Sequence, residues 1–154
     1  MPPRRPERPV PARRPMFNRL LVPVDLSPRN ARPLRMALAL ARESHAQVIL
    51  LHVVEQIADT PAAELSAFYR RLLRRAQRRL EVLATPFARA GIPVSTEASI
   101  GQAARDIVRT AARRKVDLLV LGSHRVRLDR PALAWGTISY KVGIFCQCPV
   151  LLVK

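Results

Sequence analysis

The stretch VDLLVLGSH at residues 116–124 decides the fold of this chain. Its apolar run ends abruptly at Gly122, as a buried strand does where it turns into a loop. Three further apolar runs have the same character: LLVPV at 20–24, VILLHVV at 48–54 and PVLLV at 149–153. Continuous apolar strands of this kind are typical of a parallel sheet that helices cover on both faces. An alternating run, IPVSTE at 92–97, predicts a fifth strand near a sheet edge.

Four helical patterns separate the predicted strands. They begin at Ser27-Pro28, at about residue 61, at Gly101 and at Gly136-Thr137. Their expected apolar positions are, in the same order, Leu34, Leu38 and Ala41; Leu65, Phe68, Leu72, Leu73, Leu80 and Leu83; Ile107, Val108 and Ala111; and Ile138, Val142 and Phe145. The second helix is the longest and is expected to run from about residue 61 to residue 90, because Gly91 follows it.

The alternation of strands and helices predicts an α/β domain. Such strands pair in parallel through right-handed crossovers, and helices on both faces make the sheet doubly wound. In the spatial order 3-2-1-4-5, the winding reverses between the first and fourth strands, and ligands of open α/β sheets bind beside such a switch point. Asp25 follows the first predicted strand and Gly122 follows the fourth. Both residues therefore fall on the predicted crevice.

Two glycines flank a segment with the chemistry of a phosphate site. Gly122 stands where a strand becomes a loop, so its backbone can approach a ligand without a clash from Cβ. Gly136-Thr137 stands where a loop becomes a helix, whose N-terminus offers free N–H donors and positive dipole. The hydroxyls of Thr137 and Ser139 add further donors. The alternative interpretation is a tight turn followed by an ordinary threonine cap.

Four stretches together resemble the universal stress protein family. They are FNRLLVPVD at 17–25, VILLHV at 48–53, VDLLVLGSH at 116–124 and GTISYKVGIFCQCPVLLVK at 136–154. The resemblance covers residues 16–154. It implies a five-stranded parallel sheet in the order 3-2-1-4-5, a homodimer commonly formed along the last strand, and binding of ATP or AMP. Mg²⁺ is a further candidate cofactor that would accompany the nucleotide.

The resemblance also implies which residues bind the nucleotide. ATP-binding members share a G-x-x-G-x9-G-[S/T] segment, in which Gly122 matches the first glycine and Gly136-Thr137 the final pair. Arg125 stands at the middle glycine, and ten residues rather than nine follow it before Gly136. The family's ribose-contacting aspartate falls on Asp25 and its adenine-contacting valine on Val53. Further pocket positions fall on Pro23, Val24, Leu121, His124 and Ile138, and the candidate site also includes Arg125 and Ser139.

Several of these residues have a structural alternative. Asp25 is also placed to cap the first helix, and Val53 would be a core residue in any such sheet. His124 is more often a loop residue that makes hydrogen bonds than a catalyst. Trp135 either packs under the loop or closes over the base.

The composition is basic: the net charge is +16, from 24 Arg and 3 Lys against 11 acidic residues. One interpretation is a genome rich in G and C, whose codons favour arginine; the other is a polyanionic partner such as nucleic acid or an acidic membrane surface. We favour the first, because the arginines do not interleave with aromatic residues in the sequence. Six arginines, at positions 70, 71, 74, 75, 78 and 79, lie on one side of the long helix. They form either a solvated face or a docking surface for an anionic partner, and the solvated face is favoured.

The remaining features concern the ends of the chain and its compartment. Residues 1–15 hold six Pro and five Arg, which predicts a disordered leader. Two alternatives stay open: the leader is untranslated because translation starts at Met16, or it is a basic tail that binds a partner. Cys146 and Cys148 are interpreted as small apolar residues in a reducing compartment. No apolar run reaches the ~18 residues of a membrane span, and no apolar segment follows the leader arginines. A cytoplasmic location is therefore expected.

These observations leave three functions open. The first is a regulatory protein of the stress response that binds ATP or AMP. The second is a dimeric interaction or polyanion-binding module of the same fold without a nucleotide. The third, a slow ATPase, has little support, because the sequence holds no Walker lysine, no Ser-His-Asp set and no metal cluster, and Asp117 is expected at the opposite end of its strand. No catalytic residue is assigned.

Overall fold

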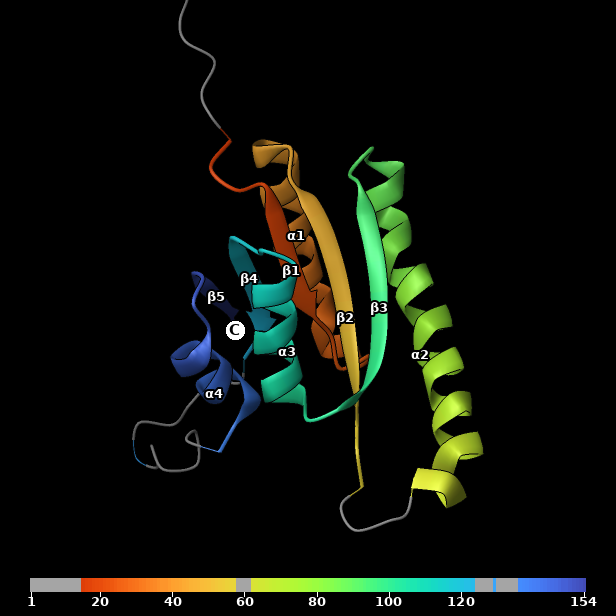
Figure 1. Cartoon of the computed structure of the whole chain (residues 1–154). Helices are drawn as coiled ribbons and strands as arrows, with labels where there is room; N and C mark the ends of the chain where they lie inside the picture. The colour runs from red at the N-terminus through yellow and green to blue at the C-terminus, as the bar shows by residue number, and fades with distance from the viewer. Residues whose placement is uncertain (1–14, 58–61, 124–128, 130–135) are drawn as a thin grey trace, which may run out of the picture.

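Five parallel strands form one sheet in the computed structural model, which describes residues 15–57, 62–123, 129 and 136–154 (Figure 1). The strands are β1 (Arg19–Pro23), β2 (Gln47–Glu55), β3 (Val94–Gly101), β4 (Leu118–Gly122) and β5 (Val150–Val153). Their spatial order is β3-β2-β1-β4-β5, with every pair parallel. The predicted order 3-2-1-4-5 and the predicted place of the third strand at an edge are therefore confirmed.

Helices pack on both faces of this sheet, as predicted. The helical elements in the described part of the chain are a 3-10 turn η1 (Pro28–Asn30) and the helices α1 (Ala31–Ser44), α2 (Ala62–Arg89), α3 (Ala103–Arg113) and α4 (Ile138–Phe145). α1 and α2 pack on one face, while α3 and α4 pack on the other (Figure 1). No helix in the described ranges has both the length and the apolar content that a bilayer crossing requires.

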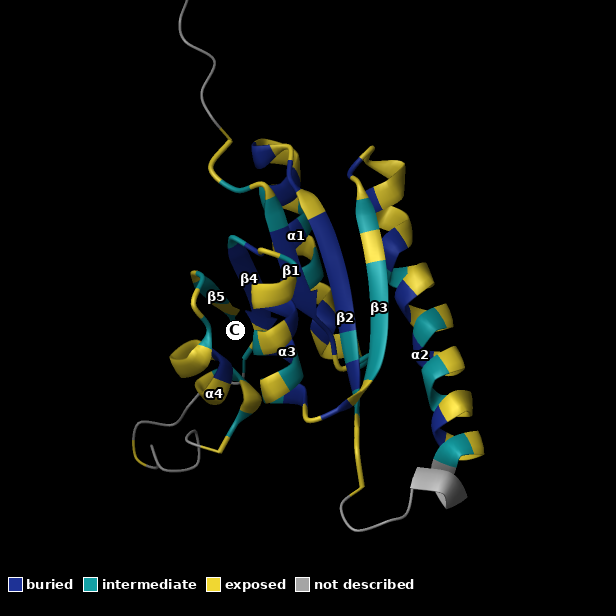
Figure 2. Ribbon diagram, in the orientation of Figure 1, coloured by how far each residue is buried: buried dark blue, intermediate teal, exposed yellow. Residues whose placement is uncertain are grey.

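The apolar strands build two separate cores because successive side chains point to opposite faces of a sheet. In β1, Leu20 and Val22 face the core beneath α1 and α2, whereas Leu21 faces the core beneath α3 and α4. All three are fully buried, and Figure 2 shows the central strands as the most deeply buried part of the molecule. Burial of apolar surface in each core stabilises the folded state by roughly 25 cal/mol per Å² of area removed from water, which is the dominant stabilising contribution.

The first helical segment follows its predicted signals with one correction. Ser27 accepts a hydrogen bond from Arg29 N and caps η1, with Pro28 in its first turn. α1 then continues to Ser44. Its buried positions are Pro33, Ala37, Ala41 and Ser44. The predicted positions Leu34 and Leu38 lie only at the margin of this core, half-buried, because small residues at the helix centre let α1 approach the sheet closely.

The long helix α2 matches its predicted extent, but part of its apolar face was assigned wrongly. Leu80 is buried, and the other buried side chains of α2 are Tyr69, Ala76, Ala84 and Phe87. Leu72, Leu73 and Leu83 are half-buried. Phe68 is 38% exposed, because Tyr69, not Phe68, lies on the same side of the helix as Leu80 and Phe87.

The sequence predicted that a helix begins at Gly101, but this residue ends β3 instead. It pairs with Glu55 at the end of β2, and its carbonyl accepts a hydrogen bond from Gln56 N. α3 begins two residues later, at Ala103. A Cβ at Gly101 would lie 1.8 Å from Oδ2 of Asp106, so a larger residue there would displace the carboxylate that accepts a hydrogen bond from Gln102 N at the helix start.

Asp117 lies at the opposite end of the sheet from the crevice, as predicted. Its carboxylate accepts hydrogen bonds of 2.7 Å from Asn18 N and 3.0 Å from Arg19 N, which join the starts of β1 and β4. Asp117 thus stabilises the pairing of these two strands and lies away from the crevice.

The two cysteines are free thiols that pack against the core beneath α3 and α4. Their sulfurs lie 3.3 Å apart. Burial, together with the hydrogen bond and charge of the neighbouring Cys146, raises the pKa of Cys148 to about 12. At neutral pH this thiol is protonated and unreactive, which agrees with its interpretation as a small apolar residue.

Candidate functional site

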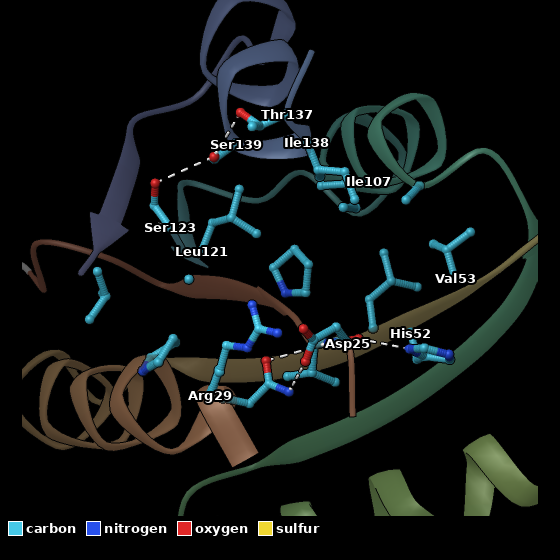
Figure 3. Close-up of a pocket in the computed structure, with 18 of the residues that line it drawn as sticks. Asp25, Arg29, His52, Val53, Ile107, Leu121, Ser123, Thr137, Ile138 and Ser139 are labelled. Carbon is cyan, nitrogen blue, oxygen red and sulfur yellow. Dashed lines mark hydrogen bonds between the residues drawn. The ribbon is translucent and has the colours of Figure 1, made fainter. Parts of the chain in front are cut away.

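A cavity of about 820 Å³ opens at the carboxyl ends of β1, β2 and β4, at the switch point of the sheet (Figure 3). Its volume lies in the range of small-molecule sites, roughly 300–1,000 Å³. It brings together most of the predicted site residues: Pro23, Val24, Asp25, Val53, Leu121, Gly122, Gly136, Thr137, Ile138 and Ser139. His124, Arg125 and Trp135 lie outside the described residues.

Asp25 lies just beyond β1 and organises one side of the cavity. Its Oδ1 accepts hydrogen bonds from Ser27 N at 2.9 Å and from Asn30 Nδ2 at 2.5 Å. Asp25 therefore holds the turn that leads into η1, while Ser27 itself is the cap. Within the described residues Oδ2 makes no hydrogen bond, which leaves it available to a ligand hydroxyl.

The carboxyl group of Asp25 is ionised at neutral pH. Partial burial raises its pKa, but the hydrogen bonds from Ser27 and Asn30 and the nearby charge of Arg29 together bring the pKa below its ordinary value of 3.8. An ionised carboxylate accepts hydrogen bonds and donates none. This end of the cavity therefore suits a ligand with hydroxyl donors.

His52 fixes the strand ends beside Asp25. Its Nδ1 lies 2.8 Å from the carbonyl oxygen of Val24. Because a carbonyl only accepts, Nδ1 of His52 carries the hydrogen of this bond. The bond ties the end of β2 to the chain just after β1, so His52 positions the rim of the cavity.

An apolar surface lies beside this rim. Val53 is 9% exposed and belongs to the core beneath α3, together with Ile107 and Leu121. All three also line the cavity. Val53 is therefore a core residue that also lines the cavity, so its position is compatible with both interpretations of the sequence. A flat apolar group fits against this surface.

Hydroxyl groups line the opposite side (Figure 3). Thr137 caps α4, since its Oγ1 accepts from Tyr140 N at 3.3 Å. The Thr137 and Ser139 hydroxyls lie 3.3 Å apart, and Ser123 Oγ lies 3.4 Å from Ser139 Oγ. The polar wall thus combines hydroxyls from the end of β4 with the N-terminus of α4, and both favour an anion.

Cations continue this wall. Lys154 Nζ donates to Ser123 Oγ at 3.2 Å, and Arg32 Nη1 donates to the Lys154 carbonyl at 2.8 Å. Arg29 also lines the cavity, on the Asp25 side. The charged side chains of the described lining are these three cations and two carboxylates, Asp25 and Glu55. Two of these cations, Lys154 and Arg32, adjoin the hydroxyl wall. Because Arg29 lies on the Asp25 side, positive charge borders the cavity on both sides.

The two glycines that match the family segment, Gly122 and Gly136, differ in their surroundings. A Cβ at Gly122 would lie 3.1 Å from Cγ of Pro33, so the packing of α1 restricts this position. A Cβ at Gly136 would meet nothing within 4 Å. Gly136 thus leaves open space at the mouth of the hydroxyl wall.

Several lining residues were not assigned to the site from the sequence: Arg29, Asn30, Arg32, His52, Glu55, Ile107, Ser123 and Lys154. The same rule that placed Asp25 and Gly122 could have found Lys154, because β5 runs parallel to β4 and its carboxyl end must reach the same sheet edge. Arg29 and Arg32 follow Asp25 closely in the chain. Whether their side chains face the cavity depends on how α1 packs against the sheet, which no pattern in the sequence indicates.

Comparisons with known proteins agree with this fold and cavity. The model of the universal stress protein family matches residues 16–154. The chain is 28% identical over 149 residues to universal stress protein YxiE of Bacillus subtilis (strain 168), covering 90% of this chain and 100% of that protein. The solved structure of hypothetical protein MJ0577 superposes with a TM-score of 0.78 at 25% identity, covering 90% of this chain and 96% of the other.

A universal stress protein from Archaeoglobus fulgidus, solved in complex with dAMP, has the same fold. Its TM-score is 0.59 at 20% identity, and the match covers 90% of this chain and 98% of that one. The family match spans both halves of the cavity, from Asp25 to Gly136-Thr137. The chain belongs to the universal stress protein family.

Proposed function

We propose that the cavity binds an adenine nucleotide, ATP or AMP, and that occupancy serves as a signal in the stress response. One observation carries the proposal: a single cavity joins the ionised Asp25 carboxylate, an apolar surface at Val53 and a cationic hydroxyl wall. These three environments match the ribose hydroxyls, the base and the phosphates of a nucleotide, in that order. The dAMP bound to the Archaeoglobus fulgidus relative supports the adenine class.

In this proposal the ribose hydroxyls donate to Asp25 Oδ2, and the base lies against Val53 and Ile107. The phosphates then reach the N-terminus of α4, where Thr137 and Ser139 provide hydroxyls. Lys154 and Arg32 neutralise phosphate charge from the β5 side. Binding of Mg²⁺ along with ATP stays a prediction.

We assign this site a binding role and no catalytic residue. The ring of His52 already donates to the Val24 carbonyl, and Oδ1 of Asp25 already accepts from Ser27 and Asn30. Both side chains thus hold the cavity in shape. The proposal includes the cytoplasmic location predicted from the sequence.

The proposal also includes a homodimer formed through β5. This strand is the edge of the sheet beyond β4, and an edge strand presents unpaired backbone groups. Leu152 in β5 is 39% exposed, and Phe145 at the end of α4 is 64% exposed. A second copy of the chain would cover this apolar edge.

Thermal unfolding with a panel of nucleotides tests the proposal. A ligand at 100 times its Kd stabilises the folded state by about 2.7 kcal/mol, which raises the Tm of a domain this size by roughly 5–10 °C. We expect this shift with ATP or AMP and none with inorganic phosphate at the same concentration. An unchanged Tm in millimolar ATP, AMP, ADP and cyclic nucleotides would contradict the proposal and favour the alternative, an interaction module of the same fold without a nucleotide.

A further inference from the structure

The outward face of α2 carries a group of arginines that the nucleotide site does not use. Arg70, Arg71, Arg74, Arg75 and Arg78 are all exposed, and we call them the α2 arginine face. The next arginine, Arg79, differs because its guanidinium donates to the Leu26 carbonyl at 2.8 Å. Among the described residues, those that line the nucleotide cavity all come from elements other than α2. In Figure 1, α2 runs along the β3 side of the sheet, away from α4.

The charges of this face are not neutralised by the described part of the protein. On α3, by contrast, arginines are paired: Arg105 and Arg109 lie 3.6 and 3.7 Å from Asp106. Arg113 and Arg114 both contact Glu97. No arginine of the α2 face forms an ion pair with a described residue, and Glu81 on the same helix accepts from Gln77 instead. Five like charges are thus held together by the helix without a carboxylate among them.

The face is also hollowed and holds an aromatic ring. A groove of about 460 Å³ is lined by Phe68, Arg71, Leu72, Arg74, Arg75 and Arg78. Phe68 is 38% exposed and packs edge-on against Tyr69, with ring centroids 5.7 Å apart. Because 3.6 residues make one turn, Phe68 lies one turn before Arg71 and two turns before Arg75 on the same side. The arginines do not interleave with aromatic residues along the sequence, but the fold of the helix places one ring, Phe68, beside them in the groove.

We propose that the α2 arginine face binds single-stranded nucleic acid. Guanidinium groups bind phosphate oxygens through paired N–H donors, and the exposed face of Phe68 offers a stacking surface for a base. From Phe68 to Arg78 the helix rises about 15 Å, which gives room for several nucleotides. Single strands expose their bases to stacking, whereas a duplex would use the arginines alone.

Other polyanions fit the observations less well. A membrane-surface helix inserts an apolar face, but the apolar face of α2, with Leu80 and Phe87, is buried against the sheet. An acidic protein would neutralise the arginines but gives no role to the half-exposed Phe68. The ring within the groove is the observation that favours nucleic acid.

Fluorescence anisotropy with a labelled 20-nucleotide dT oligomer tests this proposal on the full chain. We expect binding that weakens with salt. The variant Arg71→Gln/Arg75→Gln/Arg78→Gln should reduce the slope of log K against log[salt] by about 2, since each phosphate contact on a single strand contributes roughly 0.7. Phe68→Leu should weaken binding by about five-fold or more. The matched control, Arg35→Gln/Arg42→Gln/Lys115→Gln, removes the same charge elsewhere and should keep the slope.

Three results would overturn the proposal. Equal losses in the two triple variants would show that net charge alone attracts the oligomer. An unchanged affinity in Phe68→Leu, with duplex DNA bound as tightly as the single strand, would remove the stacking role. Displacement of the oligomer by polyglutamate at equal charge concentration would instead indicate an acidic protein partner. Circular dichroism and thermal unfolding of each variant show whether it is folded, so a loss of binding is assigned only to folded protein.

Discussion

Lys154 Nζ donates a 3.2 Å hydrogen bond to Ser123 Oγ, which joins the carboxyl ends of β5 and β4. The contact continues through Ser139 to Thr137 at the N-terminus of α4. Side chains from three elements therefore form one polar wall with a cation at its end. This wall is what distinguishes the cavity from an apolar crevice of the same shape, and in our account it receives the phosphates.

Lys154→Met should lower the affinity for ATP more than the affinity for adenosine. The ammonium is solvent-exposed, so the loss for ATP should be about two- to five-fold and should shrink as salt is added. Isothermal titration calorimetry at low and high ionic strength measures both effects. Lys141→Met, an exposed lysine on α4 outside the cavity, is the control. If Lys154→Met lowers the affinity for adenosine as much as the affinity for ATP, Lys154 does not contact the phosphates.

Gly136→Val should abolish nucleotide binding and leave the fold intact. A Cβ at this position meets nothing within 4 Å, so the new side chain fits the protein but occupies the space in front of the hydroxyl wall. Gly143→Val is a matched control, because Gly143 is equally open but lies outside the cavity. Circular dichroism checks the fold and calorimetry the binding. Undiminished nucleotide binding by Gly136→Val would show that the phosphates do not bind at the N-terminus of α4.

Asp25→Asn should destabilise the protein at neutral pH but not in acid. The pKa of Asp25 is lowered on folding, so its ionised form adds stability above pH ~4, and this contribution is lost as the pH falls through the folded value. Because Asp25 is exposed, the loss at pH 7 should be below about 1 kcal/mol.

Urea unfolding of wild type and variant at several pH values measures this difference. Glu43→Gln, which removes an exposed carboxylate on α1, provides the comparison. A wild-type advantage that persists undiminished at pH 2 would show that the hydrogen bonds to Oδ1, and not the charge, stabilise the turn at Asp25.

Phe87→Ala should cost roughly 3–5 kcal/mol of unfolding free energy. The ring is 1% exposed, in the core between α2 and the sheet. Val82→Ala on the same helix should change stability little, because Val82 is 71% exposed. Urea titrations give both values. Similar costs for the two substitutions would contradict the assignment of the buried side of α2.

The sequence predicted the sheet and much of the cavity because both depend on local patterns. Apolar runs located the strands, and the strand ends at Asp25 and Gly122 located the crevice. The error at Gly101 has a physical cause: β3 continues through Ala98 and Ser99, which have little strand propensity, because the ladder with β2 holds them extended. Pairing with a neighbouring strand is not encoded in the residues of the strand itself.

The polar contacts of the cavity lay beyond sequence reasoning for a similar reason. The bond from Arg32 to the Lys154 carbonyl joins residues that are 122 positions apart, and the His52 bond to Val24 spans 28. Such contacts depend on how the helices and strand ends pack. The exposure of Phe68 depends in the same way on which side of α2 faces the sheet. The sequence pattern did not determine that side, because three of its leucines are only half-buried.

Calorimetric titration of the wild-type protein, Asp25→Ala and Gly136→Val with ATP and AMP tests the central claim most directly. Our account predicts one nucleotide bound per chain for the wild type and no measurable binding for either variant, because the substitutions act on opposite sides of the same cavity. Absence of binding heat for the wild type with both nucleotides at millimolar concentration and at two temperatures, or undiminished binding by both variants, would contradict it.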